Sequence, residues 1–271
     1  MYKKIALAVA LVLVVSVSCF AAATPLTKTV SLDQKVLKKS SPPPKTAGKD
    51  VIAAEVDITY PLLSSLGKDV AVDAVNKAIQ SRLLGLLEGQ APTTPEQLVE
   101  AFFRDYEKSV KEQPDMPGGW SMKFEATVRH ADADLICLEV LQSMFLGGAH
   151  PDSNISYLVF SMKTGEPIDL SGFVPEKNLG DLTKVAEKHF REVRKLKPEE
   201  TYEQAGFQFE GNSFALNKNF LASKDGLAFC FNAYEIGPYA MGLTELVIPW
   251  NELKTVIDPK GPAAGFLNPK N

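Results

Sequence analysis

The sequence predicts an α+β fold, in which an antiparallel meander sheet packs with helices, and three observations support the prediction. Residues 120–129 alternate between apolar and polar side chains without exception, as in a strand with one solvated face. Two further apolar runs follow at short intervals, so three strands are expected to pair as a meander. Apolar residues at helical spacing lie before and after this block, and such segregated blocks indicate the α+β class.

The composition is that of a globular protein. The chain has 271 residues, of which 45% are hydrophobic and 23% charged, and its net charge is −4. These values exclude whole-chain disorder, and the single strongly apolar stretch excludes a polytopic membrane protein. The acidic balance argues against a nucleic-acid partner. Three cysteines are too few for a disulfide-built scaffold or a cysteine-rich zinc site, and we expect no cofactor.

Residues 1–23 have the pattern of a secretory signal peptide. Lys3 and Lys4 precede an apolar run over 5–17, and small residues follow up to Ala23, after which we expect cleavage. Two alternatives stay open: an uncleaved membrane anchor, or a lipid attached to Cys19. All three interpretations place the rest of the protein outside the cytoplasm, secreted, periplasmic or on the cell envelope.

Residues 24–50 are predicted to be a disordered tether rich in lysine and proline. The segment carries six lysines against two aspartates, a net charge of +4. Residues 51–271 carry 21 Lys and Arg against 31 Asp and Glu, a net charge of −10. The expected arrangement is therefore a basic arm on an acidic folded body.

Residues 51–118 are expected to form a small N-terminal α/β subdomain. It begins with a strand over 51–60 that Pro61 ends, followed by a helix over 70–87. A second helix begins at Thr94, because a threonine N-cap followed by proline, with glutamine three residues after the cap, is a capping pattern.

Residues 119–258 are expected to form the larger α+β domain, and 259–271 a flexible tail. After the meander, apolar residues at helical spacing predict one long helix. Shorter apolar runs predict three more strands, and Pro249 opens a last short helix. The predicted ranges are strands over 120–129, 135–145, 155–162, 207–216, 227–232 and 246–248, and the long helix over 179–196.

Two loops contain the candidate functional residues. The first surrounds His150, and the second follows the predicted strand over 227–232. Glycine and proline shape both loops, since glycine permits backbone conformations closed to other residues and proline restricts the residue before it. The candidate binding residues are His150, Tyr234, Glu235 and Tyr239, and the loop-shaping residues are Gly147, Gly148, Pro151, Gly237, Pro238 and Gly242.

Three interpretations of these loops stay open. His150 and Glu235 form a general acid–base pair, the two tyrosines form a recognition surface, or the side chains close the core. Familiar hydrolase, phosphate-loop and dinucleotide motifs are absent from the sequence. His130 and His189 are interpreted as structural, and no spacing predicts a metal site.

Cys137 and Cys230 lie in two predicted strands, and we expect them to form a disulfide. An oxidising compartment favours pairing, and the alternative is two buried free thiols. The pairing requires the two strands to be neighbours, which the sequence does not show.

The two loops and their surroundings resemble the PdaC/RsiV-like superfamily of secreted bacterial domains. The similarity covers about residues 51–257, and its specific motifs are 145–151, 156–157, 163–165, 168–170, 226–229, 234–242 and 247–249. The resemblance implies an α+β fold and an envelope-facing domain of mostly unknown function. RsiV-like members bind lysozyme directly, and PdaC-like members act on cell-wall glycan through a separate catalytic domain, whose motif this sequence lacks.

Two functions from different classes follow as hypotheses. The first is a non-catalytic binding or sensing domain for cell-wall glycan (peptidoglycan) or a lysozyme-like protein. The acidic body favours a basic protein, because negative charge steers a positive partner. The second is a hydrolase that uses His150 and Glu235. A purely structural envelope adaptor is a third hypothesis, supported only by the tether.

Overall fold

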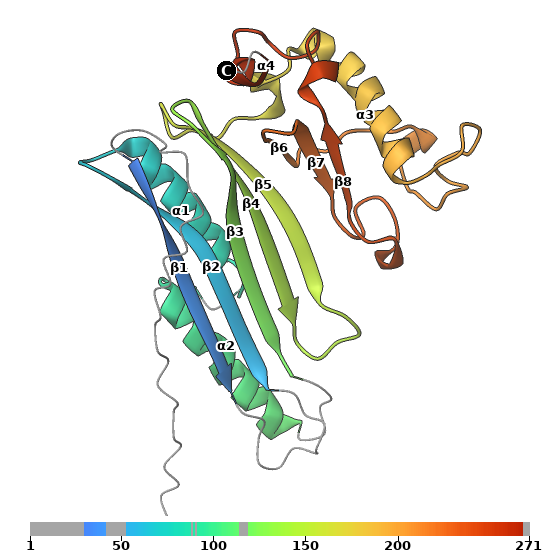
Figure 1. Ribbon diagram of the computed structural model, residues 1–271. Coiled ribbons are helices and arrows are strands. Elements are labelled where there is room, and N and C mark those ends of the chain that lie inside the picture. The colour runs from blue at the N-terminus through green and yellow to red at the C-terminus, as the bar shows by residue number, and fades with distance from the viewer. Residues whose placement is uncertain (1–29, 42–52, 88, 90, 114–118, 268–271) are drawn as a thin grey trace, which may run out of the picture.

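The computed structural model describes residues 30–41, 53–87, 89, 91–113 and 119–267. Two sheets form its framework (Figure 1). The large sheet has the strand order β1–β2–β3–β4–β5, and the small sheet has the order β6–β7–β8. The strands are β1 Val30–Ser41, β2 Ala54–Ser65, β3 Ser121–Ala131, β4 Leu135–Phe145, β5 Asp152–Ser161, β6 Phe220–Ala222, β7 Leu227–Phe231 and β8 Thr244–Ile248.

Four α-helices accompany the sheets in the described part of the chain. They are α1 Val70–Leu84, α2 Pro95–Glu112, α3 Leu179–Val193 and the short α4 Ala264–Leu267. The first two cover one face of the large sheet, and α3 packs on the small sheet against β8 (Figure 1). The predicted α+β class is confirmed.

The predicted meander is also confirmed. β3 pairs antiparallel with β4, and β4 pairs antiparallel with β5. The apolar side chains that alternate along β3, Met122, Phe124 and Ala126, are buried against α1 and α2. The predicted start of α2 is present as well, since the side chain of Thr94 accepts a hydrogen bond from the Gln97 N–H at 3.2 Å. The glutamine side chain turns back to Thr93 instead of the cap residue.

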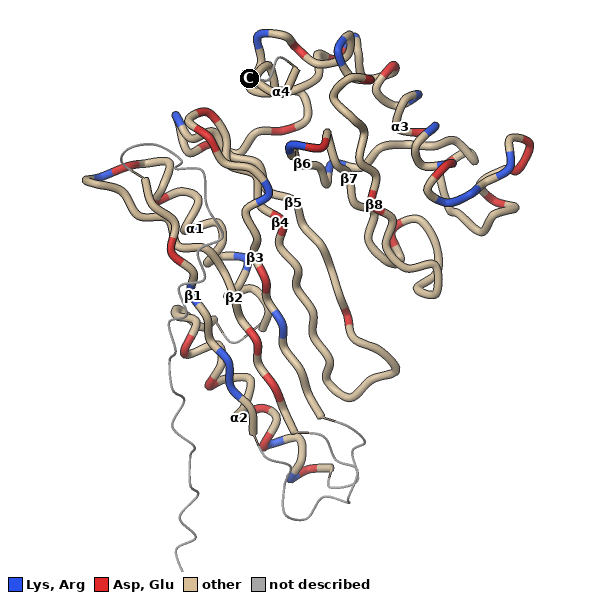
Figure 2. Tube along the Cα trace, viewed as in Figure 1, with Lys and Arg blue, Asp and Glu red and all other residues tan. Residues whose placement is uncertain are grey.

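The expected tether over 24–50 is wrong for residues 30–41, which form strand β1. All twelve of them pair antiparallel with β2, from Val30 opposite Ser65 to Ser41 opposite Ala54. β1 is the outer strand of the large sheet, where lysines keep an exposed edge from pairing with other chains. Figure 2 shows these basic residues on β1, which made the segment look like a solvated arm in the sequence.

Pro61 does not end β2, contrary to the prediction. The parallel pairing between β2 and β3 covers only Glu55–Thr59, so Pro61 lies where β2 has just one neighbour, with Gln34 of β1 opposite. Proline has no N–H to donate, but it is tolerated at a position where the strand has a neighbour on one side only. The strand therefore continues to Ser65.

The expected boundary between residues 118 and 119 is wrong, because it divides one sheet. β2 precedes the boundary and β3 follows it, yet the two are hydrogen-bonded neighbours connected through α1 and α2. Two hydrophobic cores lie on the two faces of this sheet. β4 contributes to both: Ile136, Leu138 and Val140 face the helices, whereas Leu135 and Cys137 face the small sheet.

Two predictions near the C-terminus also need correction. No strand forms over 207–216, where Gly211 and Asn212 have positive φ angles and the phenylalanines instead surround Phe190 of α3. The expected flexible tail over 259–271 is packed as far as residue 267. Phe266 stacks on Trp250, with 4.6 Å between ring centroids.

The expected signal peptide over 1–23, with Cys19, lies outside the described residues. In the part of the chain that the structure describes, no helix has the length and apolar character needed to cross a bilayer.

Candidate functional site

The first candidate loop joins β4 to β5. Gly147 has φ +86°, a conformation that favours glycine, whereas Gly148 borders open space. His150 and Pro151 are exposed at the end of the loop, and Nδ1 of His150 lies 3.1 Å from the Pro151 carbonyl oxygen. The loop therefore presents the imidazole at the surface.

The second candidate loop joins β7 to β8. Tyr234 has φ +68°, unusual for a bulky residue, and its side chain is 64% exposed. Pro238 begins the 3₁₀ turn η4, Tyr239–Met241, and Gly242 ends it with φ +67°. The backbone therefore directs two tyrosines outward, at some conformational cost at Tyr234.

The structure brings His150, Tyr234 and Tyr239 together, and we call these three residues the aromatic cluster. The rings of His150 and Tyr239 stack, with centroids 3.6 Å apart and 13° between planes. The Tyr234 hydroxyl lies 3.3 Å from Nε2 of His150, and the two tyrosine rings are 5.6 Å apart. Because His150 and Tyr234 are exposed, the cluster is a surface feature and does not close the core.

Glu235 does not join the aromatic cluster. One carboxylate oxygen accepts the Asn232 N–H at 2.8 Å, and the other accepts the Asn217 side-chain amide at 2.7 Å. The carboxylate therefore holds the turn at the start of its own loop. The described residues show no hydrogen bond or ion pair between His150 and Glu235, so the geometry does not form the expected acid–base pair.

Residues far away in sequence hold the second loop in place. The guanidinium of Arg194, at the end of α3, donates to the Met241 carbonyl oxygen at 3.1 Å and lies 5.0 Å above the Phe207 ring. Gly237 packs so closely that an added Cβ would lie 2.6 Å from the Met241 sulfur. Sequence patterns identified the glycine but not Arg194, because nothing in its local sequence marks this contact.

Asparagine side chains join the two sheets beside this loop. β5 is the edge strand of the large sheet, and amides from the small sheet satisfy its free backbone groups. Asn232 accepts the Ile155 N–H at 2.7 Å and donates to the Ile155 carbonyl at 3.0 Å. Asn219 accepts the Tyr157 N–H at 2.7 Å and also donates to the Ile155 carbonyl. The amides replace a missing strand and fix β7 against β5.

Tyr157 and Glu245 form a second polar contact between the sheets. The hydroxyl of Tyr157 donates to the Glu245 carboxylate at 2.8 Å. Burial and this bond raise the pKa of Tyr157 far above its ordinary value of 10.0. Burial also raises the pKa of Glu139, which lies opposite Tyr157 on β4. The bond between Tyr157 and Glu245 crosses from one sheet to the other, so it reinforces the joint, whereas Glu139 pairs with Arg129 inside the large sheet.

Cys137 and Cys230 are free and fully buried, so the predicted disulfide is wrong for this structure. Cys137 lies on β4 of the large sheet and Cys230 on β7 of the small sheet. Burial raises the pKa of both thiols to about 12. A thiol with so little thiolate is a poor nucleophile.

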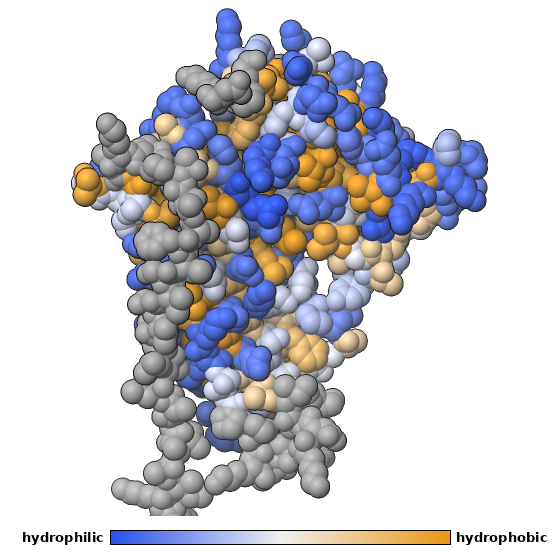
Figure 3. Space-filling view, in the orientation of Figure 1, coloured by the Kyte–Doolittle hydropathy of each residue, from blue (hydrophilic) through white to orange (hydrophobic). Residues whose placement is uncertain are grey.

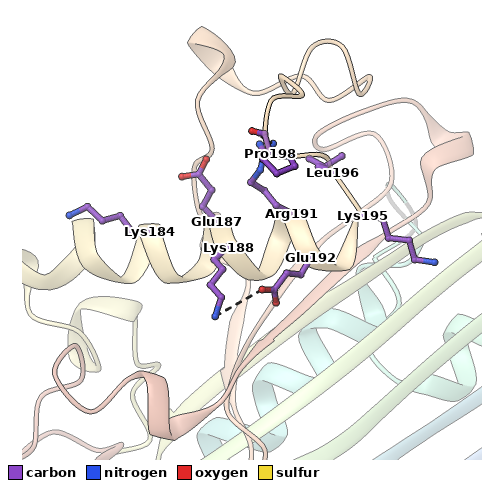
Figure 4. A pocket seen from close by; sticks show the side chains of 8 residues that line it. All are labelled: Lys184, Glu187, Lys188, Arg191, Glu192, Lys195, Leu196 and Pro198. Carbon is purple, nitrogen blue, oxygen red and sulfur yellow. Dashed lines mark hydrogen bonds and ion pairs between the residues drawn. The ribbon is translucent and has the colours of Figure 1, made fainter.

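A shallow depression of about 590 Å³ runs along α3 (Figure 4). Its central residue, Arg191, donates to the carbonyl oxygens of Lys197 and Glu200, and Glu187 accepts the Tyr202 hydroxyl at 2.6 Å. Its polar groups thus hold the following loop, and the depression does not resemble an enclosed active site. Among the described residues, no group of three or more His, Cys, Asp or Glu is arranged to hold a metal ion.

Comparisons with known proteins agree on a family of unknown function. The chain is similar in structure to a DUF3298 family member from Bacteroides fragilis, with a TM-score of 0.69, 20% identity, and coverage of 89% of this chain and 98% of that one. It is also similar to a DUF3298 family protein from Pseudomonas aeruginosa, with a TM-score of 0.61, 20% identity, and coverage of 91% and 100%. At this identity, the likeness establishes the fold.

No curated protein matches the sequence. The superfamily resemblance, which the comparisons do not name, stays a prediction. The comparisons agree with the general part of that resemblance, a domain of unknown function. The match to a family model covers α3, the small sheet and the loop with Tyr234 and Tyr239, but not His150: residues 173–251 match the model of DUF3298, described as a protein of unknown function.

Proposed function

We propose that the protein is an envelope-facing, non-catalytic binding domain, and that the aromatic cluster contacts a cell-wall glycan. The observation that supports this proposal is the ring of exposed His150 stacked on half-buried Tyr239, with exposed Tyr234 beside the pair. A tyrosine offers a flat apolar face and a polar hydroxyl at low entropic cost, which suits a ligand with both apolar and hydroxyl-bearing faces. A sugar ring has that character.

The rigidity of the loops supports the proposal further. Arg194 and Gly237 hold the second loop, and Glu235 hydrogen-bonds its first turn. A surface that is ordered before binding loses less conformational entropy when the ligand arrives. The proposal assigns no catalysis to the cluster, because the nearby carboxylate serves the loop.

Binding to soluble peptidoglycan fragments tests the proposal. We expect Tyr239→Ala to weaken binding at least tenfold, because it removes the ring on which His150 stacks, and Tyr234→Ala to weaken it several-fold. Leu243→Ala is the matched control, since Leu243 is 47% exposed in the same loop but belongs to no ring contact. Titration calorimetry at moderate salt measures the dissociation constants. Equal affinities for Tyr239→Ala and Leu243→Ala would refute the glycan proposal.

A basic protein such as a lysozyme is the second candidate ligand, and the negative charge of residues 51–271 favours it. The three lysines of β1 offset part of that charge. Electrostatic steering predicts association with lysozyme that slows steeply as salt rises, whereas stacking on a neutral glycan is nearly independent of salt. Association rates at 50 and 300 mM salt distinguish the two candidates.

A further inference from the structure

The turn between β2 and α1 carries the two most exposed large apolar side chains of the described residues. Leu66 is 86% exposed and Val70 is 66% exposed. The turn projects from the body at the far left of Figure 1, and the surface there is hydrophobic in Figure 3. Two such side chains four residues apart on one protruding turn gather apolar surface at a single place, unlike apolar residues scattered singly over a surface.

The turn is held in a defined shape. The Ser65 hydroxyl donates to the Gly67 carbonyl at 2.6 Å, and Gly67 has φ +116°. The Asp69 carboxylate accepts the N–H groups of Ala71 and Val72, so it caps α1. The acidic side chain is thereby turned to the helix, and Lys68 is the exposed charge between the two apolar residues.

The chain enters the fold beside this turn. Val30, the first residue of β1, lies opposite Ser65 at the end of β2. The apolar run over 5–17 and Cys19 precede Val30 by a short distance in sequence. The 11 residues from Cys19 to Val30 span at most about 40 Å, even fully extended. Any attachment to a bilayer through Cys19 therefore keeps this corner within about 40 Å of the lipid.

We infer that, in a chain attached to the membrane by an uncleaved N-terminal anchor or a lipid on Cys19, the β2–α1 turn is a lipid-contact point, at which Leu66 and Val70 insert into the interface of a bilayer and Lys68 meets its anionic headgroups. Two side chains are too few to recruit the protein from solution. They suffice as a second membrane contact in a chain that is already attached, because the attachment raises the local concentration of the turn at the membrane.

The contact sets the orientation of the domain. The β4–β5 loop with His150 lies at the end of the large sheet where Phe145 pairs with Ser121, whereas Ser65 lies at the other end of β2. With the turn on the lipid, the aromatic cluster points away from the membrane. The inference does not depend on what that cluster binds.

Quenching by brominated lipid tests the inference on the full chain, incorporated in vesicles of phosphatidylethanolamine and phosphatidylglycerol at a ratio of 3:1. Leu66→Trp places a tryptophan in the turn, and Val193→Trp places one at another exposed apolar position, at the end of α3. The unsubstituted chain supplies the background of Trp120 and Trp250. We expect the added fluorescence at 66 to be quenched at least twofold more strongly than that at 193.

Equal quenching at both positions, or none at 66, would overturn the inference. A blue shift at 66 that grows with protein concentration and resists brominated lipid would assign the turn to a second copy of the chain, which also overturns it. Both substitutions replace exposed residues, so we expect both variants to fold, and the quenching can be compared directly.

Discussion

Asp132 stabilises the turn between β3 and β4 through three hydrogen bonds. Oδ1 accepts the N–H groups of Asp134 and Leu135, each at 2.8 Å, and Oδ2 lies 2.9 Å from Nε2 of His130. Burial opposes the charged form, but the bonds to His130 and the backbone outweigh it and lower the pKa of Asp132 from 3.8 to about 2. The stabilisation is therefore complete above pH 3.8 and is lost as the pH falls through 2.

Asp132→Asn should lower the free energy of unfolding at pH 7 by about 1 kcal/mol, since the carboxylate is half exposed and solvent weakens its interactions with His130 and the backbone. The amide keeps the Oδ1 acceptor, so Asp132→Ala should cost about 2 kcal/mol. Urea denaturation at pH 7, 4 and 2.5 measures both, and the asparagine variant should lose less stability on acidification. Asp134→Asn is the control, because Asp134 pairs with Lys163 at the surface. Equal effects at both positions would contradict this account.

Gly226 is a position where close backbone approach excludes any side chain. A Cβ there would lie 2.1 Å from the Ile248 carbonyl oxygen, an atom that cannot move without breaking β8 away from β7. We expect Gly226→Ala to destabilise the fold by about 3 kcal/mol. Gly180→Ala, in the first turn of α3 with nothing within 4 Å, should be neutral or slightly stabilising. Thermal unfolding compares them, and a small effect at Gly226 would contradict the packing argument.

At the scale of single elements, the sequence predicted those strands and helices that interactions between nearby residues determine. The alternation along β3 and the capping residues of α2 act within a few residues, so both elements were predicted from sequence. β1 was missed because its stability comes from β2 and from its position at the edge, where lysines are expected. In the candidate site, glycine and proline located the loops, but Asn217, which bonds Glu235, and Arg194, which bonds Met241, lie elsewhere in the sequence.

The asparagine joint is an element-scale feature whose strength is measurable. Asn219→Asp keeps the acceptor for the Tyr157 N–H, but it places a carboxylate against the carbonyl oxygens of Ile155 and Cys230. We expect a loss of about 2 kcal/mol and faster hydrogen exchange at the Tyr157 amide. Asn154→Asp, on the exposed part of β5, should change neither. Unchanged exchange at Tyr157 in Asn219→Asp would show that the amide does not hold the joint.

At the scale of the whole molecule, the sequence suggested two domains because the helix pair and the meander are separate blocks along the chain. The structure unites them, since β2 crosses over to pair in parallel with β3, and a pairing between distant residues leaves no local pattern. β4 is buried on both faces and belongs to both cores. If either core unfolds, β4 loses the packing on one of its faces, and the other core depends on the same strand.

We consequently expect one cooperative unfolding transition, and two tryptophans report on the two cores. Trp120 packs against Tyr106 and Phe102 in the helix-side core, whereas Trp250 is buried beside the small sheet. Denaturation curves from Trp250→Phe, which leaves Trp120, and from Trp120→Phe should each coincide with that variant's curve from circular dichroism.

Truncation in either core should shift both signals together. Leu138→Ala on the helix side and Leu246→Ala in the small sheet are both fully buried, and each should lower the free energy of unfolding by about 3 kcal/mol. If Leu246→Ala moves the Trp250 transition and leaves that of Trp120 in place, the small sheet unfolds on its own. The shared strand β4 would then fail to couple the two cores, and the boundary between independent units would lie inside the predicted domain 119–258 instead of between residues 118 and 119.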